Sequence, residues 1–389
     1  MRVAERLKKI PPYPFMELRK KVKEAKERGV DVINLGVGDP VEPTPQSVID
    51  EMCKRAYDPA NHRYPLDEEK GMLSFRKAVA EWYRKNYAVE VNPSQEILAL
   101  IGSKEGCHHF IMAMVNPGEI VLMTDPGYPA YRASIYLAGA KPYSLPIFEE
   151  NHYLPDFSKI PPLVIKQTRA MFINYPNNPT GACASKEFFS KVVEFAKKNN
   201  IAVCHDNPYS EFVFEGEKRL SFLSVSGAKE VGIELNSLSK PYNMTGWRIG
   251  MALGNSQIIA SMSKVKENTD SGIFNPIQYA AIKALKTEES NIRKMLQIYT
   301  LRRNLVIKSF REMGANFKPQ KGTFYLWIPV PKGMSSLGFT NLLFDKAGVV
   351  VTPGTAYGKY GEGFIRISLT VPDERLKEAM HRIKEIRYG

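Results

Sequence analysis

The sequence contains few cysteines, and none of them belongs to a recognisable motif. Cys53, Cys107, Cys183 and Cys204 lie far apart in a chain of 389 residues, and no Cys-x-x-Cys pair occurs. This spacing indicates neither a zinc site nor a redox-active pair, and it is typical of reduced thiols inside a cell. We therefore predict no metal site and no structural disulfide.

Long apolar segments are also absent. No apolar run approaches the roughly 18 residues that a membrane-spanning helix needs. The N-terminus, Met1 to Lys9, is basic but lacks the apolar core of a signal peptide. We therefore expect no membrane partner and a cytoplasmic location.

Acidic residues are fewer than basic ones, 41 against 54, which gives a net charge of +13. Such a charge attracts polyanions, including nucleic acids. However, the densest basic run, Arg19 to Arg28, is interrupted by Glu24 and Glu27 at the spacing of a solvated helix face. No helix-turn-helix, zinc finger or arginine-rich arm accompanies it. We predict no nucleic-acid partner, and a basic surface would equally attract anionic acid substrates.

The length and the 43% hydrophobic content suffice for one large core and a smaller one. Between residues 90 and 255, apolar strands alternate with helices, which predicts an α/β domain with a mostly parallel sheet flanked by helices. A long helix over 287–313 then leads into a smaller α+β domain. We predict an N-terminal arm and part of the small domain at 1–45, a large domain at 46–286, and a small C-terminal domain at 287–389.

The stretch from Asn236 to Gly250 places Lys240 among small hydroxyl residues, with an arginine nearby. A lysine amine with the ordinary pKa of about 10.4 is almost always protonated at pH 7, so burial or imine formation is needed to make it reactive. Ser237, Ser239 and Arg248 offer hydrogen-bond donors for a phosphate. These residues suit a Schiff base with a phosphorylated aldehyde, pyridoxal 5'-phosphate. By itself, Ser-x-Ser-Lys also fits an ordinary surface lysine.

Other polar residues follow predicted strands, where ligands bind in parallel sheets. Ser103 and Lys104 stand between a strand and a helix start, an arrangement that binds anions. Asp206 follows an apolar strand and needs a cationic or donor partner if buried, such as a protonated ring nitrogen. Arg366, within an apolar strand, suits a carboxylate, although an exposed edge of the small sheet would also accommodate it.

Together these motifs resemble the class I and II aminotransferases, which are fold-type-I pyridoxal-phosphate enzymes, from about Tyr13 to the C-terminus. The resemblance lies in Ser-Leu-Ser-Lys…Thr-Gly-Trp-Arg-Ile-Gly, Leu-Gly-Val-Gly-Asp-Pro, Asp-Pro-Gly-Tyr-Pro and Asn-Asn-Pro-Thr-Gly. It implies that Lys240 binds the cofactor as an imine and then acts as the base that moves a proton from the substrate to the cofactor. The expected reaction moves an amino group from an L-amino acid to a 2-oxo acid.

The resemblance also implies the remaining cofactor contacts. Tyr128 would stack on the ring, Asn178 and Tyr209 would contact the ring oxygen, and Asp206 would pair with the ring nitrogen. The phosphate ligands would be Ser103, Lys104, Ser237, Ser239, Arg248 and, in a homodimer with shared active sites, Tyr64 of the partner subunit. His205 is expected on the other face of its strand and receives no role.

Among class I and II enzymes, the motifs are most similar to those of the LL-diaminopimelate aminotransferases, which use 2-oxoglutarate in lysine biosynthesis. This similarity implies that Arg366 binds the substrate α-carboxylate and that the loop at Gly36 closes over the substrate. Asp67 and Asn275 are candidates for the distal groups, with Asp67 coming from the partner subunit. Aminotransfer from alanine, aspartate or aromatic amino acids, and C–S bond cleavage on the same fold, remain alternatives.

Overall fold

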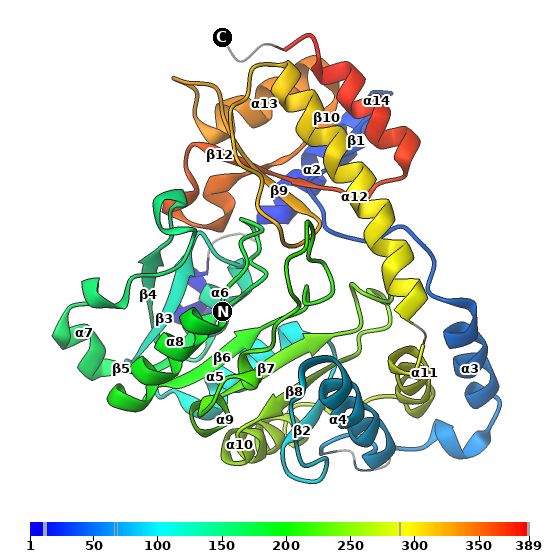
Figure 1. Cartoon of the computed structure of the whole chain (residues 1–389), viewed down its shortest axis with the longest axis vertical. Coiled ribbons are helices and arrows are strands. Elements are labelled where there is room, and N and C mark those ends of the chain that lie inside the picture. Colours follow the sequence, from blue (N-terminus) through cyan, green and yellow to red (C-terminus); the bar gives the residue numbers. More distant parts are fainter. Residues whose placement is uncertain (11–13, 66, 68, 288, 387–389) are drawn as a thin grey trace.

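A seven-stranded sheet forms the centre of the molecule (Figure 1). The computed structural model describes residues 1–10, 14–65, 67, 69–287 and 289–386. The strands of this sheet are β2 (Ile97–Leu100), β3 (Ile120–Asp125), β4 (Lys141–Pro146), β5 (Thr168–Ile173), β6 (Ala202–Asp206), β7 (Gly232–Ser237) and β8 (Gly250–Gly254). They lie in the order β2-β8-β7-β6-β5-β3-β4, in which β8 runs antiparallel to both β2 and β7 and the other neighbouring pairs are parallel. The predicted mostly parallel α/β sheet is confirmed.

Helices cover both faces of the sheet because its strands are apolar on both sides. One face packs against α5 (Ser103–Met114), α6 (Pro129–Leu137) and α10 (Ser256–Glu267). The other packs against α4 (Leu73–Tyr87), α8 (Lys186–Asn199) and α11 (Asn275–Leu285). Successive strand residues alternate between the two cores, as Val203 and Cys204 do in β6. Most polar groups therefore lie at the strand ends, although His205 and Glu234 are buried within β6 and β7.

A second, smaller body has its own apolar core. Its antiparallel sheet contains β9 (Tyr325–Pro329), β11 (Thr352–Pro353) and β12 (Phe364–Ser368), with β12 in the middle. Around it lie α12 (Glu289–Glu312), α13 (Ser336–Ala347) and α14 (Asp373–Ile383). Near the N-terminus, β1 (Ile33–Asn34) pairs in parallel with β10 (Val349–Val350), so the N-terminal segment joins this body. This packing supports the predicted division at residues 45 and 286, which stays a prediction.

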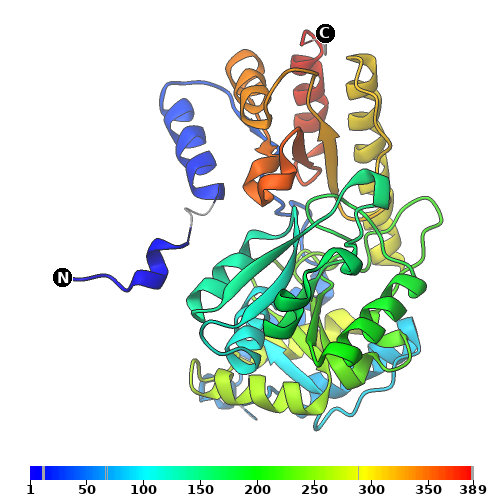
Figure 2. The ribbon, with the colours of Figure 1, turned by 90° about the vertical axis from the view of Figure 1, so that its left-hand side faces the viewer.

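The side view shows the larger body below the smaller one, with the N-terminal segment at one side (Figure 2). The remaining α-helices are α1 (Glu5–Lys8), α2 (Pro14–Glu27), α3 (Gln46–Ala56), α7 (Pro162–Gln167) and α9 (Ala228–Val231). Among the helices in the described ranges, none has both the length and the apolar character needed to cross a membrane.

Candidate active site

The carboxyl ends of the parallel strands open into a cavity of about 240 Å³ between the two bodies. Polar groups from the strand ends gather there because ligands in a parallel sheet bind at the carboxyl ends of its strands. Most of the site residues predicted from sequence line this cavity. They are Ser103, Lys104, Tyr128, Asn178, Asp206, Tyr209, Ser237, Ser239, Lys240, Arg248 and Arg366.

Lys240 follows β7 and projects into the cavity, where its Nζ donates a hydrogen bond of 2.7 Å to the carbonyl oxygen of Gly38. Desolvation lowers the pKa of Lys240 to about 8, assisted by Arg366 and Arg248 and opposed by Asp39. Gly38 is required for this contact, because a Cβ atom there would overlap with the hydroxyl of Tyr325. The fold therefore makes one lysine amine reactive near neutral pH.

This lowered pKa predicts how the apoenzyme reacts with an acylating reagent such as acetic anhydride. The rate of labelling at Lys240 should rise with pH and level off above a midpoint near 8. Exposed lysines with the ordinary pKa of about 10.4 should continue to gain reactivity through pH 10. Peptide mass spectrometry after short reaction times measures both classes in one sample. A midpoint at Lys240 that coincides with that of the exposed lysines would contradict the desolvation argument.

Asp206 ends β6 on the wall of the cavity and is almost completely buried. Its Oδ2 atom accepts a 2.7 Å hydrogen bond from the hydroxyl of Tyr131, whereas Oδ1 has no hydrogen-bond partner in the described part of the chain. Burial raises the pKa of Asp206 to about 6, against the opposing effects of Tyr131 and His205. A buried carboxylate oxygen without a donor is unfavourable, and a protonated pyridine nitrogen in the cavity would satisfy it.

The N-terminus of α5 forms one end of the cavity and suits a phosphate. Ser103 and Lys104 stand in the first turn of this helix, the end at which the helix dipole is positive. Arg248 adds a guanidinium group, held by the carbonyl oxygens of Thr245 at 2.9 Å and Ile101 at 3.4 Å. The hydroxyls of two serines, Ser237 and Ser239, complete the set. Donors and positive charge thus lie at the edge of the cavity, as a phosphate requires.

Arg366 lies in the central strand of the small sheet, and only 1% of it is exposed. Its Nη1 and Nη2 atoms donate to Asn178 Oδ1 at 2.8 Å and to the Gly36 carbonyl oxygen at 2.7 Å. Its guanidinium carbon lies 3.8 Å from the centre of the Tyr325 ring. The exposed-edge interpretation of this arginine is therefore wrong. A buried guanidinium at a cavity wall is a site for an anionic group such as a carboxylate.

Some cavity residues were not predicted from sequence. Tyr325 places its hydroxyl 3.2 Å from that of Tyr209, and Asn174 accepts the backbone N–H of Asn178 at 2.7 Å. Both therefore position predicted site residues. Tyr325 lies on a strand that the sequence indicates, but no pattern distinguishes it from a core tyrosine.

Tyr64, Asp67 and Asn275 do not line this cavity within one chain. Tyr64 is 78% exposed, and Asn275 is buried at the start of α11. Asp67 accepts hydrogen bonds of 3.2 Å from Arg76 Nη2 and from the Leu73 N–H. If these residues act at a cavity of this kind, a second subunit must bring them there.

Glu105, His109 and Asp270 lie close enough together to hold a metal ion. However, the buried ammonium group of Lys266 already contacts the two carboxylates, at 3.1 Å from Glu105 and 2.8 Å from Asp270. Burial also lowers the pKa of His109 to about 4. The lysine thus supplies the positive charge that a metal would otherwise bring.

An amine activated by burial, an acid facing the same cavity and an anion site at its edge characterise one class of enzyme on a sheet of this kind: the fold-type-I pyridoxal-phosphate enzymes. Residues 30–383 match the sequence family described as aminotransferase class I and II. The chain therefore belongs to this family, and it is a pyridoxal-phosphate-dependent transaminase.

Individual proteins are similar to this chain over nearly its whole length. The chain is 48% identical over 386 residues to a protein of Moorella thermoacetica named LL-diaminopimelate aminotransferase, covering 99% of this chain and 98% of that one. It is 49% identical over 384 residues to a protein of the same name from Aquifex aeolicus, covering 99% of each. Among solved structures, apo-BacF of Bacillus subtilis superposes with a TM-score of 0.96 at 37% identity, covering both chains completely.

Proposed function

We propose that this transaminase exchanges an amino group between LL-diaminopimelate and 2-oxoglutarate, a reaction of lysine biosynthesis. The observation that carries this proposal is the near-complete alignment, at almost half identity, with proteins named for that activity. The cavity supports it, because a reactive lysine and a buried arginine suit an amino acid substrate.

In this proposal, pyridoxal 5'-phosphate, when bound, supplies an aldehyde that links to amines and a ring that stabilises negative charge at the substrate carbon. Lys240 would hold the aldehyde, and its amine would afterwards carry a proton for the substrate. Asp206 would accept a hydrogen bond from the ring nitrogen, Tyr128 would cover the ring, and Asn178 and Tyr209 would hold its oxygen. The phosphate would be held by Ser103, Lys104, Ser237, Ser239 and Arg248.

We further propose a homodimer that completes each site. Tyr64 of the partner subunit would contact the phosphate, and Asp67 and Asn275 of the partner subunit would lie near the distal end of the substrate. The exposure of Tyr64 and its absence from the cavity of its own chain support this assignment. Sedimentation of the holoenzyme, together with complementation between Tyr64→Phe and Lys240→Ala chains, tests it. Mixed dimers should regain partial activity only if each site uses both subunits.

A screen of amino donors against 2-oxoglutarate tests the substrate assignment. We expect LL-diaminopimelate to give the highest kcat/KM, with alanine, aspartate and aromatic amino acids well below it. Formation of glutamate, coupled to glutamate dehydrogenase, measures each donor. No turnover with LL-diaminopimelate would contradict the substrate while leaving the transaminase intact. Release of pyruvate from cystathionine without any 2-oxo acid would instead indicate a C–S lyase.

Arg366→Lys should lower kcat/KM by about 100-fold. Lysine keeps the positive charge but loses the planar fork that binds a carboxylate at two points, and hydrogen bonds to charged groups contribute about 1.5–3 kcal/mol. The affinity for cofactor should change little, and this can be measured by fluorescence titration of the apoenzyme. A donor that lacks the α-carboxylate provides the control, because its residual turnover should be insensitive to the substitution. Equal losses for both donors would show that Arg366 supports the fold and does not bind the carboxylate.

A further inference from the structure

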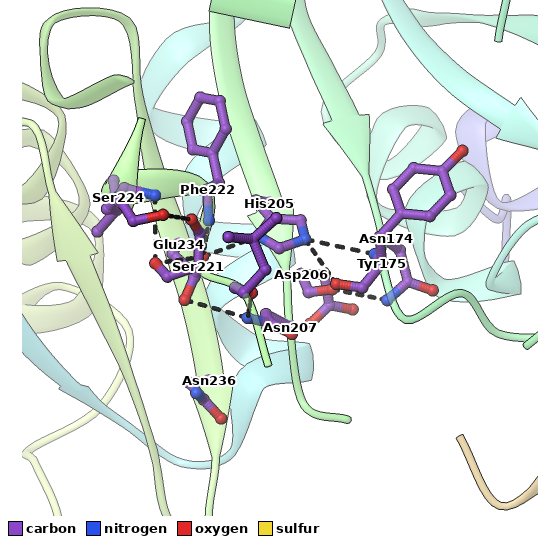
Figure 3. Close-up of polar contacts among 12 residues, drawn as sticks. Asn174, Tyr175, His205, Asp206, Asn207, Ser221, Phe222, Ser224, Glu234 and Asn236 are labelled. Carbon is purple, nitrogen blue, oxygen red and sulfur yellow. Dashed lines mark hydrogen bonds and ion pairs between the residues drawn. The ribbon is translucent and has the colours of Figure 1, made fainter. Parts of the chain in front are cut away.

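Figure 3 shows a buried pair of ionisable residues, His205 and Glu234, on adjacent strands. The His205 ring contacts Phe189 and Phe222, which belong to the core on the other face of the sheet from Tyr131. His205 on β6 and Glu234 on β7 are register neighbours, and both are completely buried. The Nδ1 atom of His205 is 2.8 Å from Glu234 Oε2. The expected position of His205 on the opposite face of its strand is confirmed, and its surroundings give it a role that the sequence did not indicate.

Glu234 is surrounded by hydrogen-bond donors. Its Oε1 atom accepts from the Tyr83 hydroxyl at 2.9 Å and from Asn207 Nδ2 at 3.2 Å. Its Oε2 atom accepts from the Ser221 hydroxyl at 3.0 Å and from the Phe222 N–H at 2.8 Å. Hydrogen bonds donated to both oxygens of a carboxyl group favour its anionic form. A proton on either oxygen would point at a donor hydrogen and break one of these bonds.

His205 has an oxygen acceptor at each ring nitrogen. Besides Glu234, the Tyr175 carbonyl oxygen lies 2.9 Å from Nε2. The Tyr175 N–H also donates toward Nε2, at the longer distance of 3.3 Å. A nitrogen lone pair facing a carbonyl oxygen at 2.9 Å would be repulsive, whereas a proton between them makes a good hydrogen bond. Protons on both ring nitrogens fit the two short contacts to oxygen.

The hydrogen bonds around His205 and Glu234, here called the network, extend to the ends of three strands that carry site residues. Asn236 Nδ2 donates to the Tyr83 hydroxyl at 3.0 Å, and Asn236 Oδ1 accepts the N–H of Ser237 at 2.7 Å. Beside it, Asn174 Nδ2 donates to the Asp206 carbonyl oxygen at 2.6 Å. The ends of β5, β6 and β7 are thereby fixed relative to one another.

We propose that the His205–Glu234 ion pair is a positioning pair that holds the end of β6 and keeps a positive charge behind Asp206, so that Asp206 stays ionised toward the cofactor ring nitrogen. Asp206 follows His205 directly in the chain, so the imidazolium is the nearer member of the pair. His205 already opposes the burial that raises the pKa of Asp206. The proposed effect on the cofactor rests on the assignment of Asp206 to the ring nitrogen. The charge state of the His205–Glu234 pair can be tested without that assignment.

The charge state can be measured directly in the cofactor-free protein. Nitrogen-15 NMR of the apoenzyme, labelled at histidine, should show one buried histidine with two protonated nitrogens of similar shift at pH 7.5. The His205→Asn variant assigns that signal by its loss. Two widely separated nitrogen shifts at His205 would identify a neutral ring and overturn the proposal.

The effect on the ring nitrogen requires a comparison of two ligands. Wild-type apoenzyme should bind pyridoxamine 5'-phosphate more tightly than the analogue with carbon in place of the ring nitrogen. Glu234→Gln, which removes the anion, should reduce this preference about tenfold for each unit by which the pKa of Asp206 rises. Ser221→Ala, which removes one neutral donor to Glu234 and keeps the charge pair, should preserve the preference.

Each outcome of this comparison has a separate meaning. If Glu234→Gln weakens both ligands equally, the network supports the fold alone and the proposal is wrong. If the wild type does not prefer the nitrogen-containing ligand, the assignment of Asp206 is itself wrong, and the proposal falls with it. Glutamate formation by the wild-type holoenzyme would still support the transaminase in that case.

Discussion

Replacing Lys240 with alanine should lower kcat for transamination by about 10⁴-fold, the upper range for loss of a positioned acid–base group. The variant also lacks the amine that contacts Gly38 in the cavity. Lys104 lines the same cavity but lies in the first turn of α5 at the anion site, so we expect no replacement of the proton transfer from it. Borohydride treatment of the wild-type holoenzyme should leave a pyridoxyl group on the peptide that contains Lys240, and no peptide of the variant should carry it.

The matched control is Lys191→Ala, which removes an exposed lysine from α8. Its activity and its labelling should equal those of the wild type. Added primary amines should restore part of the Lys240→Ala activity, because they can supply the missing base from solution. A Lys240→Ala enzyme with more than about one hundredth of wild-type kcat would contradict the assigned role.

Sequence could locate Lys240, Ser103 and Asp206 because each follows an apolar strand of a parallel sheet. In such a sheet the carboxyl ends meet at one edge, so residues far apart in sequence converge without any knowledge of the individual contacts. Polar residues at those positions are uncommon unless they bind something. The chemistry of the cavity was therefore predictable from the order of strands and motifs.

Contacts across the two bodies could not be predicted in this way. The approach of Gly38 to Lys240 depends on β1 pairing with β10, two very short strands distant in sequence. Tyr325 reaches the cavity from the small sheet for the same reason. Such positions follow from packing between bodies, which leaves no periodic pattern in the sequence.

Two further features of the sheet were not predicted from the sequence. Strand β4 contains Pro142 and Pro146 and lies at the edge of the sheet, where proline is tolerated, so its sequence resembles a loop. The charge on His205 depends on Glu234 in the neighbouring strand, and strand order is needed to bring the two together. The sequence placed His205 on the correct face but gave no indication of its partner.

Asp206→Asn should lower kcat by about 10²- to 10³-fold. An opposite charge nearby shifts a pKa by about 1–3 units, and losing it would leave the ring nitrogen mostly unprotonated at neutral pH. Asparagine keeps the shape of the side chain and an acceptor for the Tyr131 hydroxyl. Tyr131→Phe is the matched control, because it removes that hydrogen bond and leaves the carboxylate charged. It should reduce kcat by less than about tenfold.

Asp206→Asn should also stabilise the apoenzyme, because it removes a buried carboxylate whose ionisation destabilises the folded chain. Burial raises the pKa of Asp206 from 3.8 to about 6, so the folded chain holds this proton more tightly than the unfolded chain does. The resulting destabilisation is absent below pH 3.8, grows as pH rises, and is complete above pH 6. At pH 7.5 the Asp206→Asn apoenzyme should therefore exceed the wild type by about 3 kcal/mol in free energy of unfolding, and the difference should fall below about 1 kcal/mol near pH 4. Urea denaturation at the two pH values measures it. A wild-type apoenzyme that is the more stable of the two at pH 7.5 would show that Oδ1 already has a favourable partner without the cofactor.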